Sequence, residues 1–294
     1  MPDVTWTISG SLAVSIAESD GLTSDFTLTA ALVNAEVEIE GSSLASGGFS
    51  SWGTARTDSQ GAFSLTASKP NAPRRIRARV RFRDESLKVT APSPASDWYA
   101  FHTSASKLDP PTVVIPPYTI SRDGCPKNDY TRAATWYICK TAIDALTDRD
   151  PWLAFKGKVN VIYPGKASGG AYANGVTREV IINDGPTGLF KDQWTVGTLL
   201  HELMHIWNYD HNHGASPWFG AVVTDCTTHS FQEMPAIAFH EGFAEWAKDE
   251  LLQHVWGSPR VPPATRLALQ ALKRVSGDGT SQRALAPLDT LDMV

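Results

Sequence analysis

The sequence predicts a multidomain protein in which an all-β sandwich is followed by an α+β domain. Short alternating runs in the first part, two Pro-Pro pairs after it and longer helix-type patterns beyond them support this division. A chain of 294 residues also exceeds a typical single domain and suits two. We place the sandwich at 1–105, a proline-rich linker at 106–118 and the second domain at 119–294.

Strand patterns fill the first part. Alternating apolar and polar residues, separated by Gly, Ser, Asn and Asp, predict strands at 4–8, 12–16, 26–32, 35–40, 62–65 and 76–82. Many short strands at this spacing, with no long helix among them, are typical of a β-sandwich.

Two of these strands carry opposite charges. Three acids alternate with apolar residues in 35–40, and five arginines do so in 75–83. One interpretation is a basic ribbon for an anionic polymer, and the other is a solvated face on which acids of a neighbouring strand lie opposite the arginines. The net charge of -5 favours the second interpretation, and no nucleic-acid partner is expected.

A tight turn is predicted in the segment 57–65, which reads TDSQGAFSL. Asp and Gly suit the turn, and Phe63 and Leu65 then point to one face of the following strand. The segment resembles the T-D-x-x-G-x-F turn of the transthyretin-like, or carboxypeptidase-regulatory-like, sandwich modules. Because those modules are accessories, the resemblance implies no catalysis by this part.

The second part mixes helix and strand patterns, which predicts an α+β domain. Helical spacing of apolar residues predicts helices at 131–147, 193–208, 235–254 and 264–275. Strands are predicted at 159–163 and 178–182.

The strongest functional signal is the H-E-x-x-H string His201-Glu202-Leu203-Met204-His205. Two histidines four apart on a helix share one face, so both imidazoles can bind one zinc ion. Glu202 then lies beside the ion, where it can take a proton from water. In a chain with 8 histidines this string is expected by chance only roughly 0.008 times.

A catalytic zinc needs a third protein ligand, and two candidates compete. Glu241 lies in the helix-like string F-H-E-G-F-A-E-W, and His211 lies six residues after His205. The His211 pattern, H-E-x-x-H-x-x-N-x-x-H, resembles the metzincins, with Asn208 in place of their glycine. Asn can adopt the left-handed conformation of that glycine, but this alternative leaves the E-G-F-A string unexplained. We therefore prefer Glu241.

The E-G-F-A string at 241–244, joined to H-E-x-x-H, resembles the gluzincin metallopeptidases, the thermolysin and aminopeptidase group. The resemblance implies a zincin-like fold, one catalytic Zn²⁺ and hydrolysis of a peptide or protein substrate. The departure from the family is the 35-residue separation of His205 from Glu241, which puts the intervening loop in doubt.

The same resemblance assigns roles to single residues. It implies zinc ligands at His201, His205 and Glu241, with Glu202 as the catalytic base. Glu245, one turn after Glu241, would accept an N–H from a ligand histidine.

Two further parts of the cleft follow from the resemblance. The strand at 178–182 is expected at the sheet edge, where it can bind peptide by strand addition. The oxyanion is expected to be stabilised by one of four residues, among which no spacing rule decides: Tyr172, Tyr209, His213 and His229.

Other function classes stay open at this stage. One alternative is an adhesion or binding protein with a degenerate zincin domain, and another is a zinc hydrolase of a non-peptide amide or ester. No apolar run of about 18 residues predicts a membrane span. A secreted or periplasmic location is favoured if a leader has been removed, and the cytoplasm otherwise. One disulfide with a free thiol, or three reduced thiols, fits Cys125, Cys139 and Cys226.

Overall fold

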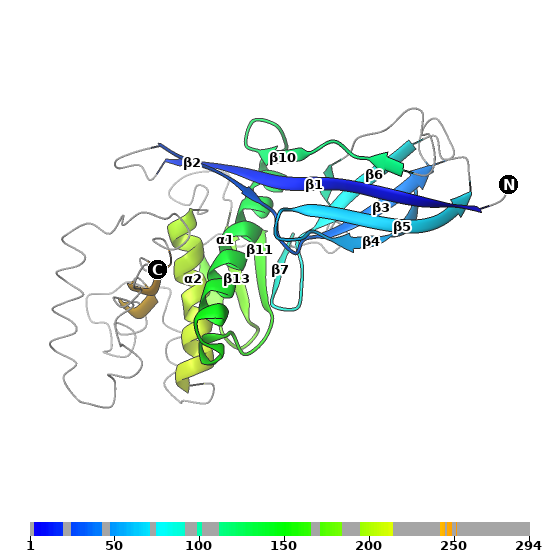
Figure 1. Ribbon diagram of the computed structural model, residues 1–294. Coiled ribbons are helices and arrows are strands. Elements are labelled where there is room, and N and C mark those ends of the chain that lie inside the picture. The colour runs from blue at the N-terminus through cyan, green and yellow to red at the C-terminus, as the bar shows by residue number, and fades with distance from the viewer. Residues whose placement is uncertain are drawn as a thin grey trace, which may run out of the picture.

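The computed structural model describes residues 3–19, 25–42, 48–70, 75–91, 99–101, 112–165, 171–183, 195–213, 242–244, 246–248 and 251. Within these residues the fold is rich in β-structure, as predicted. Figure 1 shows most strands gathered towards one end of the molecule and the two long helices side by side towards the other. No helix of the described part is long and apolar enough to cross a membrane.

The described elements follow one another in this order: β1 (Asp3–Ser19), β2 (Asp25–Ala31), β3 (Glu36–Ser42), β4 (Ser50–Arg56), β5 (Ala62–Pro70), β6 (Arg75–Arg81), β7 (Leu87–Thr90), β8 (Tyr99–Phe101), β9 (Thr112–Val114), β10 (Tyr118–Ser121), α1 (Lys127–Arg149), the 3-10 turn η2 (Pro151–Leu153), β11 (Val159–Gly165), β12 (Tyr172–Asn174), β13 (Glu179–Asn183), α2 (Val196–Asn208) and the π-helical turn η4 (Tyr209–His213).

The long strand β1 organises the first sheet. Its first half pairs antiparallel with β5 and parallel with β9, and its second half pairs antiparallel with β2 and parallel with β10. Its apolar side chains at even positions are buried: Trp6, Ile8, Leu12, Val14 and Ile16. Gly10 continues this series, and the Phe63 ring of β5 fills the space that a side chain there would take.

A second sheet, in the order β4-β3-β6-β8, covers the core beneath the first half of β1. Trp6 of β1 and Trp52 of β4 pack with ring centroids 5.8 Å apart. The apolar positions of β3 and β6 join the same core: Val37, Ile39, Ile76, Ala78 and Val80. Period two therefore buries one face of each strand, as the alternation predicts.

The turn between β4 and β5 has the predicted form. The Asp58 carboxylate accepts hydrogen bonds from the N–H groups of Gln60 (2.8 Å) and Ala62 (2.9 Å). Gly61 has a φ of +72°, and a Cβ there would lie 2.2 Å from the Leu12 carbonyl oxygen, so the position requires glycine.

A third sheet, in the order β12-β13-β11-β7, joins three strands of the second part of the chain to β7 of the first part. Strands β7, β11 and β13 run parallel to one another, whereas β12 runs antiparallel to β13. Helices α1 and α2 pack against each other and against strands of this sheet (Figure 1). The helices predicted at 131–147 and 193–208 are thus found as α1 and α2, whereas 264–275 lies outside the described residues.

Strand pairing crosses the predicted division at 105–119. The predicted linker 106–118 contains β9, which pairs with β1, and Ile115 N–H donates to the Ser9 carbonyl oxygen at 2.7 Å. From the other side, β7 pairs with β11. The physical reason is that only the prolines of this segment lack an N–H. The residues between them are extended and can still donate backbone hydrogen bonds, so they pair with a strand edge that would otherwise be open.

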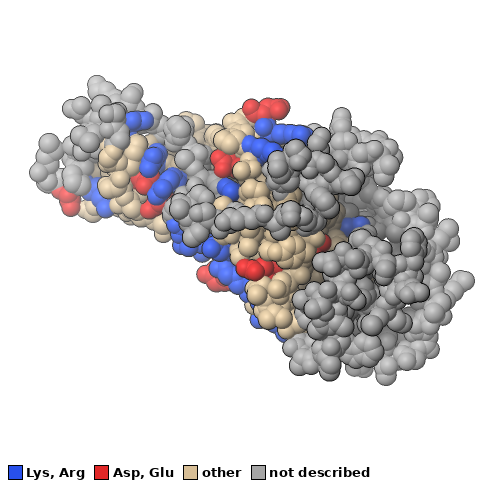
Figure 2. All heavy atoms as spheres, turned by 180° about the vertical axis from the view of Figure 1, so that it is seen from behind, with Lys and Arg blue, Asp and Glu red and all other residues tan. Residues whose placement is uncertain are grey.

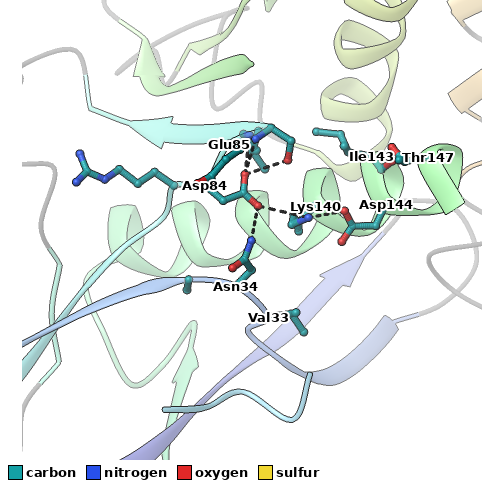
Figure 3. A network of polar contacts seen from close by, with 12 residues as sticks. Val33, Asn34, Asp84, Glu85, Lys140, Ile143, Asp144 and Thr147 are labelled. Atoms are coloured by element: carbon teal, nitrogen blue, oxygen red, sulfur yellow. Dashed lines mark hydrogen bonds and ion pairs between the residues drawn. The ribbon is translucent and has the colours of Figure 1, made fainter. Parts of the chain in front are cut away.

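Figure 3 shows the polar network at this crossing, which is centred on Asp84. Its carboxylate accepts from the side chain of Asn34 (2.8 Å) and the N–H of Leu87 (2.8 Å), and Lys140 of α1 lies 3.3 Å away. Burial alone raises the pKa of Asp84, but the Leu87 N–H, the Lys140 charge and Ser86 together lower it below its usual value. The network joins the β2–β3 turn, the β6–β7 turn and α1.

Candidate functional site

Helix α2 carries the H-E-x-x-H string. It begins after Thr195, whose side-chain oxygen accepts from Thr198 N–H at 2.9 Å and caps the helix. Its apolar side is buried in the core through residues that recur at helical spacing: Val196, Leu199, Leu200, Leu203 and Ile206. This packing fixes the rotation of the helix and with it the direction of its two histidines.

His201 and His205 face each other across one turn of α2. Their Nε2 atoms lie 3.0 Å apart, and the ring planes are nearly perpendicular at 88°. Two nitrogen ligands of a tetrahedral zinc ion, each at about 2.0–2.1 Å, lie about 3.3 Å apart. The observed spacing is therefore close to that of a shared ion, although a neutral imidazole pair joined by one N–H···N bond has a similar spacing.

Glu202 is almost completely buried, with 8% of its surface exposed, and directly follows His201. A carboxylate this deep in the core is retained only with polar or charged neighbours. Among the residues that the structure describes, no group of three His, Cys, Asp or Glu side chains is arranged to hold a metal ion. The predicted third ligand Glu241 and its neighbour Glu245 lie outside those residues.

The residues on either side of Glu245 are described and are helical, at 242–244 and 246–248. The Phe243 ring stacks on the Trp207 ring of α2, with centroids 5.4 Å apart and planes 12° from parallel. Ala244 and Ala247 are buried. The segment that begins one residue after Glu241 therefore packs against the helix of the two histidines.

His211 has a different setting. Its Nε2 lies 3.1 Å from the carbonyl oxygen of Ala154, and its ring packs against those of Trp152 and Trp207, with centroids 4.8 and 4.3 Å away. Burial lowers the pKa of His211, which favours the neutral ring with Nε2–H donating to Ala154. This nitrogen therefore already has a backbone partner.

The expected edge strand is not at the edge. Strand β13, which corresponds to the predicted 178–182 strand, lies between β11 and β12, and the three-residue strand β12 forms the edge of the sheet among the residues that the structure describes. The chain reverses between them because the Asn174 side chain accepts from Val176 N–H (3.0 Å) and Thr177 N–H (3.1 Å). A strand of three residues is too short to show an alternating pattern in the sequence.

Two of the four oxyanion candidates are described. Tyr172 is on β12 with 44% of its surface exposed, and Tyr209 follows α2, where its ring contacts Gly175 of the β12–β13 hairpin. The side chain of His213 and all of His229 lie outside the described residues. Tyr209 therefore lies on the side of α2 that the hairpin covers, whereas Tyr172 belongs to the hairpin itself.

The arginines of β6 lie opposite the acids of β3, as the preferred interpretation expects. The antiparallel register places Glu36, Glu38 and Glu40 opposite Arg81, Arg79 and Arg77. The ion pairs include Arg77 to Glu40 at 2.5 Å, Arg79 to Glu38 at 2.6 Å and Arg83 to Glu36 at 2.9 Å. Figure 2 shows basic and acidic side chains next to one another at this end of the molecule. The charge pattern thus supports a salt-bridged face rather than a polyanion site.

Cys125 and Cys139 are free thiols. Burial raises the pKa of the Cys139 thiol far above its usual value, so it is an inert core residue. Cys226 lies outside the described residues.

Comparisons with known proteins found no matching family model and no matching curated protein. The solved structures that match this chain include two distantly similar ones. A 9R-lipoxygenase from Cyanothece PCC8801 is 13% identical over 51% of this chain and 25% of its own, with a TM-score of 0.25. The major plantain pollen allergen Pla l 1 is 14% identical over 42% of this chain and 100% of its own, also with a TM-score of 0.25. These likenesses are too remote to carry a functional argument.

Proposed function

We propose that this chain is a zinc-dependent peptide hydrolase with a gluzincin-like, zincin-type α+β region behind its N-terminal sandwich. The observation that carries the proposal is the pair of imidazole nitrogens 3.0 Å apart on one face of α2, next to the buried carboxylate of Glu202. These are the residue types and the spacing that a catalytic zinc site uses.

Glu241 is our proposed third ligand. Support comes from the residues that follow it, since Phe243 stacks on Trp207, two residues after His205. The rival His211 directs its Nε2 to the Ala154 carbonyl oxygen, which weakens its claim. Glu245 follows Glu241 by four residues and so shares its face of a helix, where it would orient a ligand imidazole.

When bound, zinc supplies Lewis acidity for the peptide carbonyl and favours ionisation of water. Glu202 takes a proton as the water attacks and delivers it to the leaving amine. Glu202 directly follows His201 on α2, and its burial keeps the carboxylate at a fixed place beside the two imidazoles. The exposed edge β12 is the proposed site where the substrate adds as a further strand.

The test combines metal analysis with a digest of casein. The purified full-length chain is dialysed, its zinc content is measured, and hydrolysis is followed with and without a chelator. We expect about one zinc ion per chain and chelator-sensitive cleavage that returns when zinc is restored. A chain that binds no zinc, or that binds zinc and cleaves no peptide bond, contradicts the proposal. Zinc without peptidase activity points instead to a non-peptide substrate or to a binding protein.

A further inference from the structure

An ion pair between a half-buried arginine and a buried aspartate joins the edge hairpin to the turn that follows α2. Arg178 is the turn residue directly before β13, and Asp210 lies in η4, five residues after His205. The two guanidinium nitrogens Nη1 and Nη2 face the two carboxylate oxygens of Asp210, and the Nη2–Oδ2 distance is 3.0 Å. Such a two-point contact fixes direction as well as distance.

Both partners are held by further contacts. Arg178 Nη2 donates to the Gly157 carbonyl oxygen at 2.7 Å and Nε donates to that of Lys158 at 3.2 Å. Asp210 accepts from Lys156 N–H at 2.8 Å, and only 3% of its side chain is exposed. The pair therefore ties three segments together: the hairpin, the chain before β11 and the end of α2.

The backbone of Arg178 shows that this arrangement is imposed. Its φ is +58°, in the left-handed region that residues other than glycine rarely adopt. The position holds no glycine, and the conformation is fixed by the backbone bond from Asn160 N–H to the Arg178 carbonyl oxygen (2.9 Å) together with the side-chain contacts of Arg178.

The hairpin meets α2 on the face of the histidines. Positions 201, 205 and 209 follow one another at a spacing of four and share a helix face. A Cβ on Gly175 would lie 2.4 Å from Cγ of Tyr209, so hairpin backbone and ring are in direct contact. The edge strand β12, which precedes Gly175, therefore lies next to the C-terminal end of the helix face that carries His201 and His205.

We propose that Arg178 and Asp210 are a positioning pair that sets the distance and register of edge strand β12 relative to His201 and His205. This inference rests on the proposed peptide hydrolysis. Neither residue touches the substrate. The pair instead determines where a peptide bound along β12 places its scissile bond. Loss of the pair should therefore reduce cleavage more for a long peptide, which pairs with the whole edge, than for a short one.

The test compares Arg178→Lys and Asp210→Asn with a matched control, Arg83→Lys. Arg83 also faces a carboxylate with two nitrogens, at 2.9 and 3.0 Å from Glu36, but lies on the sandwich. Lysine keeps the charge and loses the planar two-point contact. The probes are a quenched fluorescent octapeptide that spans a casein site cut by the wild type, and its central tetrapeptide.

We expect Arg178→Lys and Asp210→Asn to retain zinc and to lose roughly tenfold to a hundredfold in kcat/KM on the octapeptide. The tetrapeptide should lose much less, and Arg83→Lys should change neither. Hydrogen exchange at the β12 amides should accelerate in the two site variants alone. If the pair contributed only to overall stability, cleavage of both peptides would fall by the same factor.

Two results overturn the inference. Equal losses on both peptides, or the same behaviour in Arg178→Lys as in Arg83→Lys, remove the positioning role and leave the proposed hydrolysis intact. A wild type that neither binds zinc nor cleaves casein removes the proposed function and this inference with it.

Discussion

Glu202 and His201 occupy adjacent positions of α2, and the buried Glu202 carboxylate is assigned the proton transfer. We expect Glu202→Gln to retain zinc and to lose casein hydrolysis by at least about a hundredfold, because general acid–base catalysis contributes that much. Glutamine has nearly the same size and removes the basic oxygen. Zinc content and kcat/KM are measured together, with Glu85→Gln as the control, since the Glu85 side chain is 88% exposed. Activity within about tenfold of the wild type would exclude Glu202 as the base.

The third ligand is decided by a comparison of two variants. Glu241→Gln should lose most of the bound zinc after dialysis, because a neutral amide is a poor substitute for a carboxylate ligand. His211→Gln should keep it, since its Nε2 faces the Ala154 carbonyl oxygen. Metal analysis of both proteins is sufficient. The reverse result, with zinc lost only from His211→Gln, would favour the metzincin-like arrangement.

Single residues differ in how far the sequence reveals them. The histidine pair follows from a spacing of four, which a helix converts directly into a shared face. Arg178 and Asp210 lie 32 positions apart and in different elements, so no local pattern connects them. In the sequence each is simply a charged residue near a turn. Arginine has no preference for the left-handed region, so the positive φ of Arg178 could not be predicted either.

At the scale of elements, α2 depends on its cap. Thr195→Ala should lower the free energy of unfolding by about 1 kcal/mol, because the N–H of Thr198 loses its acceptor. Thr195→Ser keeps the acceptor and should stay within a few tenths of the wild type. Urea unfolding of the three proteins measures the difference. Equal stabilities of the alanine and serine variants would show that the cap contributes nothing.

Elements also show where periodicity succeeds and where it stops. The amphipathic pattern of 193–208 predicts α2 closely, because one face of that helix is buried. The runs 4–8 and 12–16 were expected as two strands, but they form the single strand β1. Ser9, Gly10 and Ser11 resemble a turn in the sequence, yet they pair with Ser64, Phe63 and Ala62 of β5. Pairing with a distant strand overrides the local preference.

At the scale of the whole molecule, the two predicted parts share their sheets. The alternating acids of β3 and alternating arginines of β6 favour their pairing, because a row of like charges on one strand is stabilised by opposite charges on its neighbour. The pairing of β7 with β11 has no such signal, because the two strands carry no complementary pattern of charges. The division at 105–119 was therefore drawn from composition, whereas strand order depends on contacts between residues far apart in the chain.

Asp84 offers a test of how strongly the parts are joined. Asp84→Asn should lower the free energy of unfolding by about 3 kcal/mol at neutral pH, because Lys140 loses its buried partner. The pKa of Asp84 is lower in the folded than in the unfolded chain. Its contribution is therefore complete above the unfolded value of about 3.9 and is lost as the pH falls through the lower folded value.

The difference between wild type and Asp84→Asn should accordingly narrow below about pH 4. Asp144→Asn is the matched control, since Asp144 pairs with the same lysine but is 43% exposed, and it should cost less than about 1 kcal/mol. Urea unfolding followed by far-ultraviolet circular dichroism across this pH range gives the three curves. Equal costs for the two variants would mean that the buried Asp84 carboxylate does not hold the β2–β3 and β6–β7 turns to α1.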